Sequence, residues 1–349
     1  MMHGSSSPRS MHRNLRLFYI LLLMTGVVAA VNWYAEHHSG NLEGDAATDF
    51  ALADTAAVTR IFIADRDGGV ADLERVAGER YWLLNGEHWA RKDAVDLVLK
   101  TFLRARVKGP VPQAEREQVV KMLAARGKKV EIYTGGDSPV KTWYIGTATQ
   151  NHTGTYMVLE TAEGKARDPY VVHMEGFTGF LSTRFFTDER EWRYTGVFDF
   201  PGRSLHRVEV EAHDPEYASY AMEIATDGVL TVWGADGRRL AVRDTLAWQD
   251  QFLRFRKVHL ETYNHHLDAQ GLEAKQAHPP AFTMRAWGRG QTDPTTIELL
   301  WKDPVEDQYD EAGELMPYDG SRMYARFRGE VVLVQRFVFD PLMNGVAGE

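Results

Sequence analysis

The pentapeptide Phe102-Leu103-Arg104-Ala105-Arg106 recurs, with one substitution, as Phe252-Leu253-Arg254-Phe255-Arg256. Each copy lies in a segment whose apolar residues have helical spacing, and three strand-like segments precede each copy. Arg60 and Arg207 also occupy matching places, in the first strand-like segment of each half. A shared pentapeptide in the same order of elements predicts an internal duplication.

Hydrophobic periodicity predicts the elements of both halves. The expected helices are 93–107, 112–125 and 244–259. The expected strands of the first half are 58–65, 71–76, 80–84, 129–133, 140–145 and 155–160. Those of the second half are 205–211, 220–225, 229–233, 282–287, 296–301, 323–327 and 331–334. The predicted fold class is α+β, with two tandem similar units, each an antiparallel sheet with a helix packed on one face.

A charge-free apolar run from Leu17 to Val31 precedes both units, and three arginines precede the run. With Asn32, Trp33 and Tyr34 it reaches the short end of the roughly 17–25 residues that span a bilayer. The upstream arginines should stay in the cytoplasm, so the remaining chain is expected to be exported. Two readings stay open, a retained signal anchor, which we favour, and a signal peptide cleaved after the small residues 28–30.

These patterns predict an organisation of seven segments. They are a cytoplasmic N-terminus (1–16), a transmembrane signal anchor (17–34), a tether (35–48), a first α+β unit (49–168), an aromatic-rich connector packed between units (169–200), a second α+β unit (201–340) and a tail (341–349).

The composition excludes several classes of function. The chain of 349 residues has no Cys, which excludes disulfides, thiolate metal sites and a Cys nucleophile. Its net charge is −9, and the part after the apolar run is more acidic still because the first three arginines lie before it. Such a surface repels phosphate backbones, so nucleic-acid binding is not expected.

The connector is the stretch richest in large rings. Its rings are those of Tyr170, Phe177, Phe180, Phe185, Phe186 and Trp192. Two interpretations stay open, burial of these rings in a core and a patch that binds a partner. The candidate partner surface comprises Tyr156, Arg184, Phe185, Phe186, Trp192 and Arg193. Thr187, followed by three acids within four residues, predicts a short N-capped helix.

The connector and the segments before it also carry a resemblance. The matching motifs are Thr155-Tyr156, Pro169-Tyr170-Val171-Val172-His173, Gly176-Phe177, Leu181-Ser182, Arg184-Phe185-Phe186-Thr187 and Trp192-Arg193, with Phe50-Ala51, Asp54-Thr55, Ile61-Phe62-Ile63, Pro110-Val111-Pro112 and Val130-Glu131-Ile132-Tyr133 upstream. Together they resemble an uncharacterised bacterial family, domain of unknown function 4340, over residues 48–200 and more loosely beyond. The resemblance implies a single-pass protein of the bacterial inner membrane with most of the chain in the periplasm. Related domains occur in auxiliary subunits of gliding-motility-type ABC transporters, which implies an accessory role and supplies no catalytic residues.

Motifs for chemistry are mostly absent. The sequence has no P-loop, no dinucleotide-binding glycine pattern after a strand, no G-x-S-x-G and no H-E-x-x-H. The adjacent pairs His37-His38 and His265-His266 diverge on any regular element and read as surface residues. His173 reads as a packed strand residue, and the Asn151-His152-Thr153 acceptor pattern carries little weight in a bacterial protein. The acidic loop 303–314 reads as a solvated hairpin tip, with calcium binding as the alternative.

The sequence therefore predicts no catalytic, cofactor-binding or metal-binding residues and no cofactor. The leading hypothesis is a membrane-anchored periplasmic accessory or scaffold protein, without catalytic activity, that binds a protein partner in an envelope complex such as a transporter or motility assembly. One alternative is a periplasmic module that binds a small molecule or glycan. The other is a hydrolase without a recognisable motif.

Overall fold

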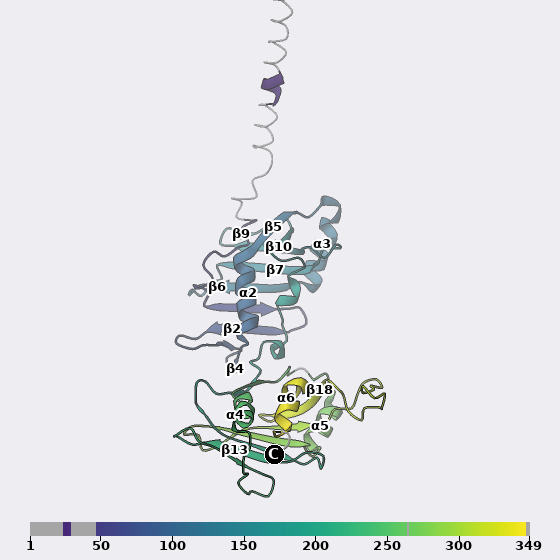
Figure 1. Cartoon of the computed structure of the whole chain (residues 1–349). Coiled ribbons are helices and arrows are strands. Elements are labelled where there is room, and N and C mark those ends of the chain that lie inside the picture. The colour runs from purple at the N-terminus through teal and green to yellow at the C-terminus, as the bar shows by residue number, and fades with distance from the viewer. Residues whose placement is uncertain (1–23, 29–46, 264, 347–349) are drawn as a thin grey trace, which may run out of the picture. The chain divides into compact units, whose positions relative to one another are not determined.

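The computed structural model describes residues 24–28, 47–263 and 265–346 (Figure 1). Residues 24–28 are helical. The rest of the predicted anchor, 17–34, lies outside the described residues, as do 1–16 and most of the tether 35–48. Within the described ranges no helix combines the length and the apolar character needed to cross a membrane.

The described chain is mostly β-structure with a few helices. The helices are α2 (Lys92–Arg104), α3 (Gln113–Arg126), α4 (Thr245–Arg254), α5 (Ala269–Ala277) and α6 (Arg336–Met343), with 3-10 turns η1 (Ser182–Arg184) and η2 (Glu189–Glu191). The strands up to residue 199 are β1 (Arg60–Ala64), β2 (Val70–Arg75), β3 (Trp82–Leu84), β4 (His88–Trp89), β5 (Ala105–Pro110), β6 (Lys128–Tyr133), β7 (Lys141–Ala148), β8 (Thr155–Thr161), β9 (Gly164–Lys165), β10 (Tyr170–Met174) and β11 (Gly196–Asp199). The later strands are β12 (Leu205–Ala212), β13 (Tyr220–Ile224), β14 (Leu230–Trp233), β15 (Lys257–His259), β16 (Phe282–Gly288), β17 (Thr295–Leu300), β18 (Arg322–Phe327) and β19 (Glu330–Gln335).

The chain divides into two compact units. Of the described residues, those within Met1–Gly68 and Leu97–Phe185 form unit 1, and those within Gly69–Asp96 and Phe186–Glu349 form unit 2. The division follows packing rather than chain order, because residues 69–96 group with the second half. The predicted boundaries at 168 and 200 remain predictions.

Unit 1 is built on antiparallel strands in the order β1-β6-β7-β8-β10-β5, with β9 paired to β8. Burial alternates along β1, so Ile61 and Ile63 point into the core while their neighbours are half exposed. The ring of Phe102 in α2 meets that of Trp143 in β7 at 5.0 Å, edge to face. Helix α3 lies close to β7 because Gly146 has no side chain; a Cβ there would come within 2.8 Å of Met122 Cε.

Unit 2 contains a seven-stranded antiparallel sheet in the order β14-β13-β12-β16-β17-β18-β19. One face packs against α4 and α6 through Trp248, Phe252 and Phe339, which are all buried in one core cluster. Part of the other face is covered by α5, whose Leu272 packs against a second cluster that includes Tyr324. The unit also holds the antiparallel pair β11-β15 and the strands β2, β3 and β4, which pair in that order.

The same order of elements occurs twice along the chain. Apart from the two-residue β4, which follows β3, the order β1, β2, β3, α2, β5, α3 and β6 is repeated as β12, β13, β14, α4, β15, α5 and β16. β1 pairs antiparallel with β6, and β12 pairs antiparallel with β16. The α+β class with tandem antiparallel sheets is thus confirmed, while the common origin of the two halves remains a prediction.

The recurrence extends to single residues. Arg60 lies opposite Tyr133 in the first pair of strands, and Arg207 lies opposite Trp287 in the second. Each guanidinium lies near the ring across from it, at 5.1 Å and 5.7 Å from the ring centroid. The two arginines that match in sequence therefore also match in structure.

Several local predictions were wrong. The helix expected over 93–107 ends at Arg104, and Ala105–Pro110 forms strand β5 because it pairs with β10. The helix expected over 244–259 ends at Arg254, and Lys257–His259 pairs with β11. Tertiary pairing overrides local helical spacing at both ends. The cap of the short helix at 189–191 is Asp188 rather than Thr187, since the Asp188 side chain accepts from the Arg190 N–H.

Candidate functional site

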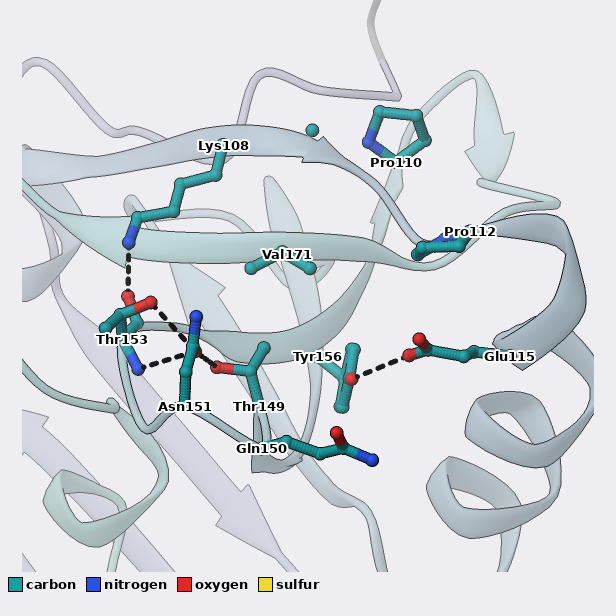
Figure 2. A pocket seen from close by; sticks show the side chains of 11 residues that line it. Lys108, Pro110, Pro112, Glu115, Thr149, Gln150, Asn151, Thr153, Tyr156 and Val171 are labelled. Carbon is teal, nitrogen blue, oxygen red and sulfur yellow. Dashed lines mark hydrogen bonds between the residues drawn. The ribbon is translucent and has the colours of Figure 1, made fainter.

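A groove of about 440 Å³ opens in unit 1 where the end of β5, the start of α3 and the β7–β8 loop meet (Figure 2). Its lining includes Lys108, Glu115, Gln150, Asn151 and Tyr156, above apolar surface from prolines and a valine. The lining comes from three stretches of sequence, 108–115, 149–156 and Val171, which the sheet pairing brings together.

The corner Pro110-Val111-Pro112 forms one end. Proline cannot donate to a strand ladder and suits the start of a helix, so β5 ends there and α3 begins at Gln113. Glu115 then lies in the first turn of α3, where the helix dipole favours a negative charge.

Tyr156 and Glu115 form the central polar contact. The Tyr156 hydroxyl donates to Glu115 Oε2 over 3.1 Å, as Figure 2 shows. Burial raises the pKa of Tyr156, and the hydrogen bond to Glu115 and its negative charge raise that pKa further. The hydroxyl therefore stays protonated at neutral pH.

The β7–β8 loop is organised by Asn151. Its Oδ1 accepts from Thr149 Oγ1 at 2.8 Å, from Thr153 Oγ1 at 2.9 Å and from the Thr153 N–H at 3.2 Å. Lys108 Nζ donates to the Thr153 carbonyl over 2.6 Å (Figure 2). The loop also needs Gly154, because a Cβ there would lie 2.6 Å from Val171 Cγ1. The groove wall is thus fixed by contacts within unit 1.

Two hydrogen-bond donors in the groove have no partner among the described residues. Among the described residues, neither the Gln150 amide nor Asn151 Nδ2 makes a hydrogen bond. A second hollow of about 350 Å³ shares Glu115, Gln150 and Tyr156 with the groove and adds His152. The arrangement offers amide donors, a phenol and one charge of each sign, which suits binding of a small polar molecule.

The six residues predicted as a partner surface are divided between the two units. Tyr156, Arg184 and Phe185 belong to unit 1, whereas Phe186, Trp192 and Arg193 belong to unit 2. Phe185 and Trp192 are fully buried, Arg184 is nearly so, and the other three are half-buried. The ring of Phe185 packs on that of Trp143 in unit 1, and Trp192 Nε1 donates to the Phe186 carbonyl in unit 2, so both buried rings have contacts within their own units.

The structure exposes apolar side chains elsewhere, on α4 and α6 of unit 2, which pack against each other. Leu246 and Leu253, seven residues apart on α4, are 77% and 53% exposed, and Phe337 on α6 is 74% exposed. The opposite side of α4 buries Trp248 and Phe252. Apolar residues on both sides of α4 were the available sequence signal for this surface, and α6 was not predicted.

The acidic loop 303–314 and His173, the other groups considered from the sequence, make contacts with their own surroundings. The acidic loop closes as a hairpin with a bridge between Tyr309 and Leu315, and Asp310 Oδ1 accepts from the N–H groups of Ala312 and Glu314. Burial lowers the pKa of His173 in β10, and nearby cations lower that pKa further. In the described part of the chain, no group of three or more His, Asp or Glu residues is placed to hold a metal ion.

No family model, no curated protein and no solved structure matches the chain. The resemblance to domain of unknown function 4340 therefore stands on its sequence motifs.

Proposed function

We propose that the chain is an accessory protein of a bacterial envelope complex. Residues 17–34 anchor it in the inner membrane, and its folded units bind a protein partner on the periplasmic side without catalysing a reaction. The apolar run and its basic flank support the anchor.

The observation that carries the binding role is the exposed apolar surface of α4 and α6. Water-exposed Leu246, Leu253 and Phe337 lie on helices whose opposite sides are well packed, so core packing does not account for them. Monomeric proteins rarely leave several large apolar side chains on neighbouring elements, and such surfaces are typical of protein interfaces.

Site-specific photo-crosslinking in cells tests this proposal. A photoreactive residue at Leu253 or Phe337 should capture the same envelope protein, whereas one at the exposed Asp227, in the β13–β14 turn of the same unit, should not. Leu253→Asp should abolish co-purification of that protein while leaving the melting temperature unchanged. Recovery of the full chain as a lone monomer, with no crosslink from either helix, would overturn the proposal.

A second candidate function is binding of a small polar molecule in the groove of unit 1. The open donors of Gln150 and Asn151 beside Tyr156 favour it, together with a volume suited to such a ligand. A ligand that binds only the folded chain raises its melting temperature, so thermal-shift screening of the full chain in lipid nanodiscs tests this function.

The matched variants for that screen are Tyr156→Phe and Tyr144→Phe. Both hydroxyls donate to a glutamate in unit 1, Tyr144 to Glu160 over 2.7 Å, but only Tyr156 lines the groove. The shift should shrink in Tyr156→Phe alone. An equal shift in both variants would place the ligand elsewhere.

A further inference from the structure

The outer face of the seven-stranded sheet in unit 2 has two different halves. Over β17, β18 and β19 an apolar cluster that includes Leu300 and Tyr324 packs against Leu272 of α5, beside the ion pair of Arg326 with Glu298. Over β14, β13, β12 and β16 the outward side chains include five charged ones, and two tryptophans, Trp233 and Trp287, stand half-exposed among them. This second half is called the tryptophan face below.

A continuous row of ion pairs crosses the tryptophan face. Arg207 Nη1 donates to Glu223 Oε2 over 3.2 Å, and Arg207 Nε donates to Glu209 Oε1 over 3.0 Å. Arg285 Nη1 lies 4.0 Å from Glu209 Oε2 and donates to Glu211 Oε2 over 3.0 Å. Two guanidinium groups and three carboxylates leave this row with one excess negative charge.

Both indoles flank this row. The Arg207 guanidinium carbon lies 5.7 Å from the ring centroids of Trp233 and Trp287 alike. The pairing of Arg207 with an aromatic ring across the strand is a feature of the fold, because Arg60 and Tyr133 repeat it in unit 1. Arg60 also has a second ring nearby, that of Phe62 at 5.7 Å. Unit 2 differs in that both rings are indoles and that Trp233 lines an open hollow.

That space is a hollow of about 470 Å³ between Trp233 and the ion-pair row. Small residues make room for it, with Ala221 on β13 and Gly234, Ala235 and Gly237 in the turn after β14. The hollow therefore exposes one side of an indole next to carboxylate acceptors and guanidinium donors.

We propose that the tryptophan face binds a neutral glycan chain. The C–H face of a pyranose ring packs on an indole, and each hydroxyl both accepts and donates hydrogen bonds, so it can use guanidinium and carboxylate groups together. An anionic ligand would meet three carboxylates and only two guanidinium groups on this face, so the face repels it. The site is separate from the partner surface and from the groove of unit 1, and it rests on neither.

Isothermal titration of the full chain in lipid nanodiscs, without glycoside detergents that would compete, tests the proposal. The probes are β-1,4-linked hexasaccharides of glucose and of N-acetylglucosamine, with a sulfated oligosaccharide as the charged comparison. At least one neutral probe should bind, and Trp233→Ala and Trp287→Ala should each weaken it about tenfold. Trp89→Ala, which removes an exposed indole elsewhere in unit 2, and Tyr156→Ala in the groove should leave that affinity unchanged.

Hydrogen exchange of the unmodified chain provides a readout that does not depend on a variant folding. The bound neutral probe should slow exchange in residues 207–211 and 219–235. Binding of no neutral probe, tighter binding of the sulfated probe, or protection confined to other segments would overturn the proposal.

Discussion

Arg193 and Glu330 form a two-pronged ion pair in unit 2, with Nη1 2.8 Å from Oε2 and Nη2 2.6 Å from Oε1. The same guanidinium lies 3.8 Å from the centroid of the Tyr263 ring. The Arg193 side chain is only 11% exposed, whereas that of Glu330 is 46% exposed. The pair therefore ties the segment after η2 to the start of β19.

Arg193→Ala should lower the free energy of unfolding by about 2 kcal/mol, because a planar two-pronged contact and a cation–π contact are lost together. The exposed Glu330 carboxylate can rehydrate, which keeps the loss moderate. Urea denaturation of the full chain measures it. The control is Arg238→Ala, whose side chain is 87% exposed and lies 3.5 Å from Asp236, and which should cost less than about 0.5 kcal/mol. Equal losses of unfolding free energy in Arg193→Ala and Arg238→Ala would contradict a stabilising role for the Arg193–Glu330 pair.

The same pair predicts a pH dependence. The hydrogen bond from Arg193 and the nearby positive charge lower the pKa of Glu330 below its ordinary value of 4.5. The stability that the pair contributes is thus fully present above about pH 4.5 and is lost as the pH falls through the lowered pKa. Glu330→Gln should be less stable than the native chain at pH 7, and the difference should vanish at the acidic end.

Unfolding curves at a series of pH values check that dependence. Glu306→Gln is the control, because no described residue pairs with Glu306. A difference between the native chain and Glu330→Gln that stays constant from pH 7 to pH 3 would exclude the predicted linkage.

Arg184 in unit 1, unlike Arg193, is a buried arginine without a carboxylate partner among the described residues. It is buried, with Nη1 2.8 Å from Thr101 Oγ1 and 3.0 Å from Met174 Sδ, and no described carboxylate pairs with it. Burial lowers the pKa of its guanidinium, although the group stays charged. Removing an unpaired buried charge relieves its desolvation cost, and Thr101 keeps its hydrogen bond to the Leu97 carbonyl.

Arg184→Met should therefore leave stability unchanged or raise it by about 1 kcal/mol, in contrast to Arg193→Ala. Thermal unfolding of both variants side by side measures the contrast. The Arg184 guanidinium also lies 4.2 Å from the centroid of the Phe177 ring. A loss greater than about 2 kcal/mol in Arg184→Met would show that its contacts outweigh the desolvation cost.

Gly154→Ala should lower the free energy of unfolding by about 2 kcal/mol, because the new Cβ meets Val171 Cγ1 at 2.6 Å and Val172 O at 3.3 Å. It should also move the loop that bears Asn151 and weaken any groove ligand. Gly136→Ala is the matched control, since its Cβ would meet nothing within 4 Å. Denaturation measures the loss of stability, and ligand-induced thermal shifts measure the weaker binding. If Gly154→Ala changed neither quantity, the loop geometry described here would be contradicted.

The sequence predicted the sheets well because alternation in strands such as β1 and β12 directly reflects burial on one face. The sequence-based predictions were wrong where pairing with a distant strand determines whether a residue is helical or extended. Nothing local distinguishes Ala105 from the helix before it, and only its position opposite Met174 makes it a strand residue. Helix α6, with only eight residues and Pro341 inside it, lacks the propensity for a sequence-based prediction.

The parts of the groove were visible in the sequence, but their assembly was not. The proline corner at 110–112, the Asn151 loop and Tyr156 each belonged to a motif, yet no pattern indicated that Tyr156 meets Glu115. That contact depends on α3 lying over β7 and β8, which the absence of a side chain at Gly146 permits. The rings of the connector had two interpretations from sequence, and burial separates Phe185 and Trp192 from the half-buried Phe186.

Strand β5 ends the strand order of unit 1, and among the described strands it pairs only with β10. Its side chains include the cations of Arg106 and Lys108, and it closes on Pro110, all of which oppose the addition of another strand. Copies of this protein that meet at high density should therefore resist polymerisation through β5, and this edge carries its own safeguard against amyloid-like growth.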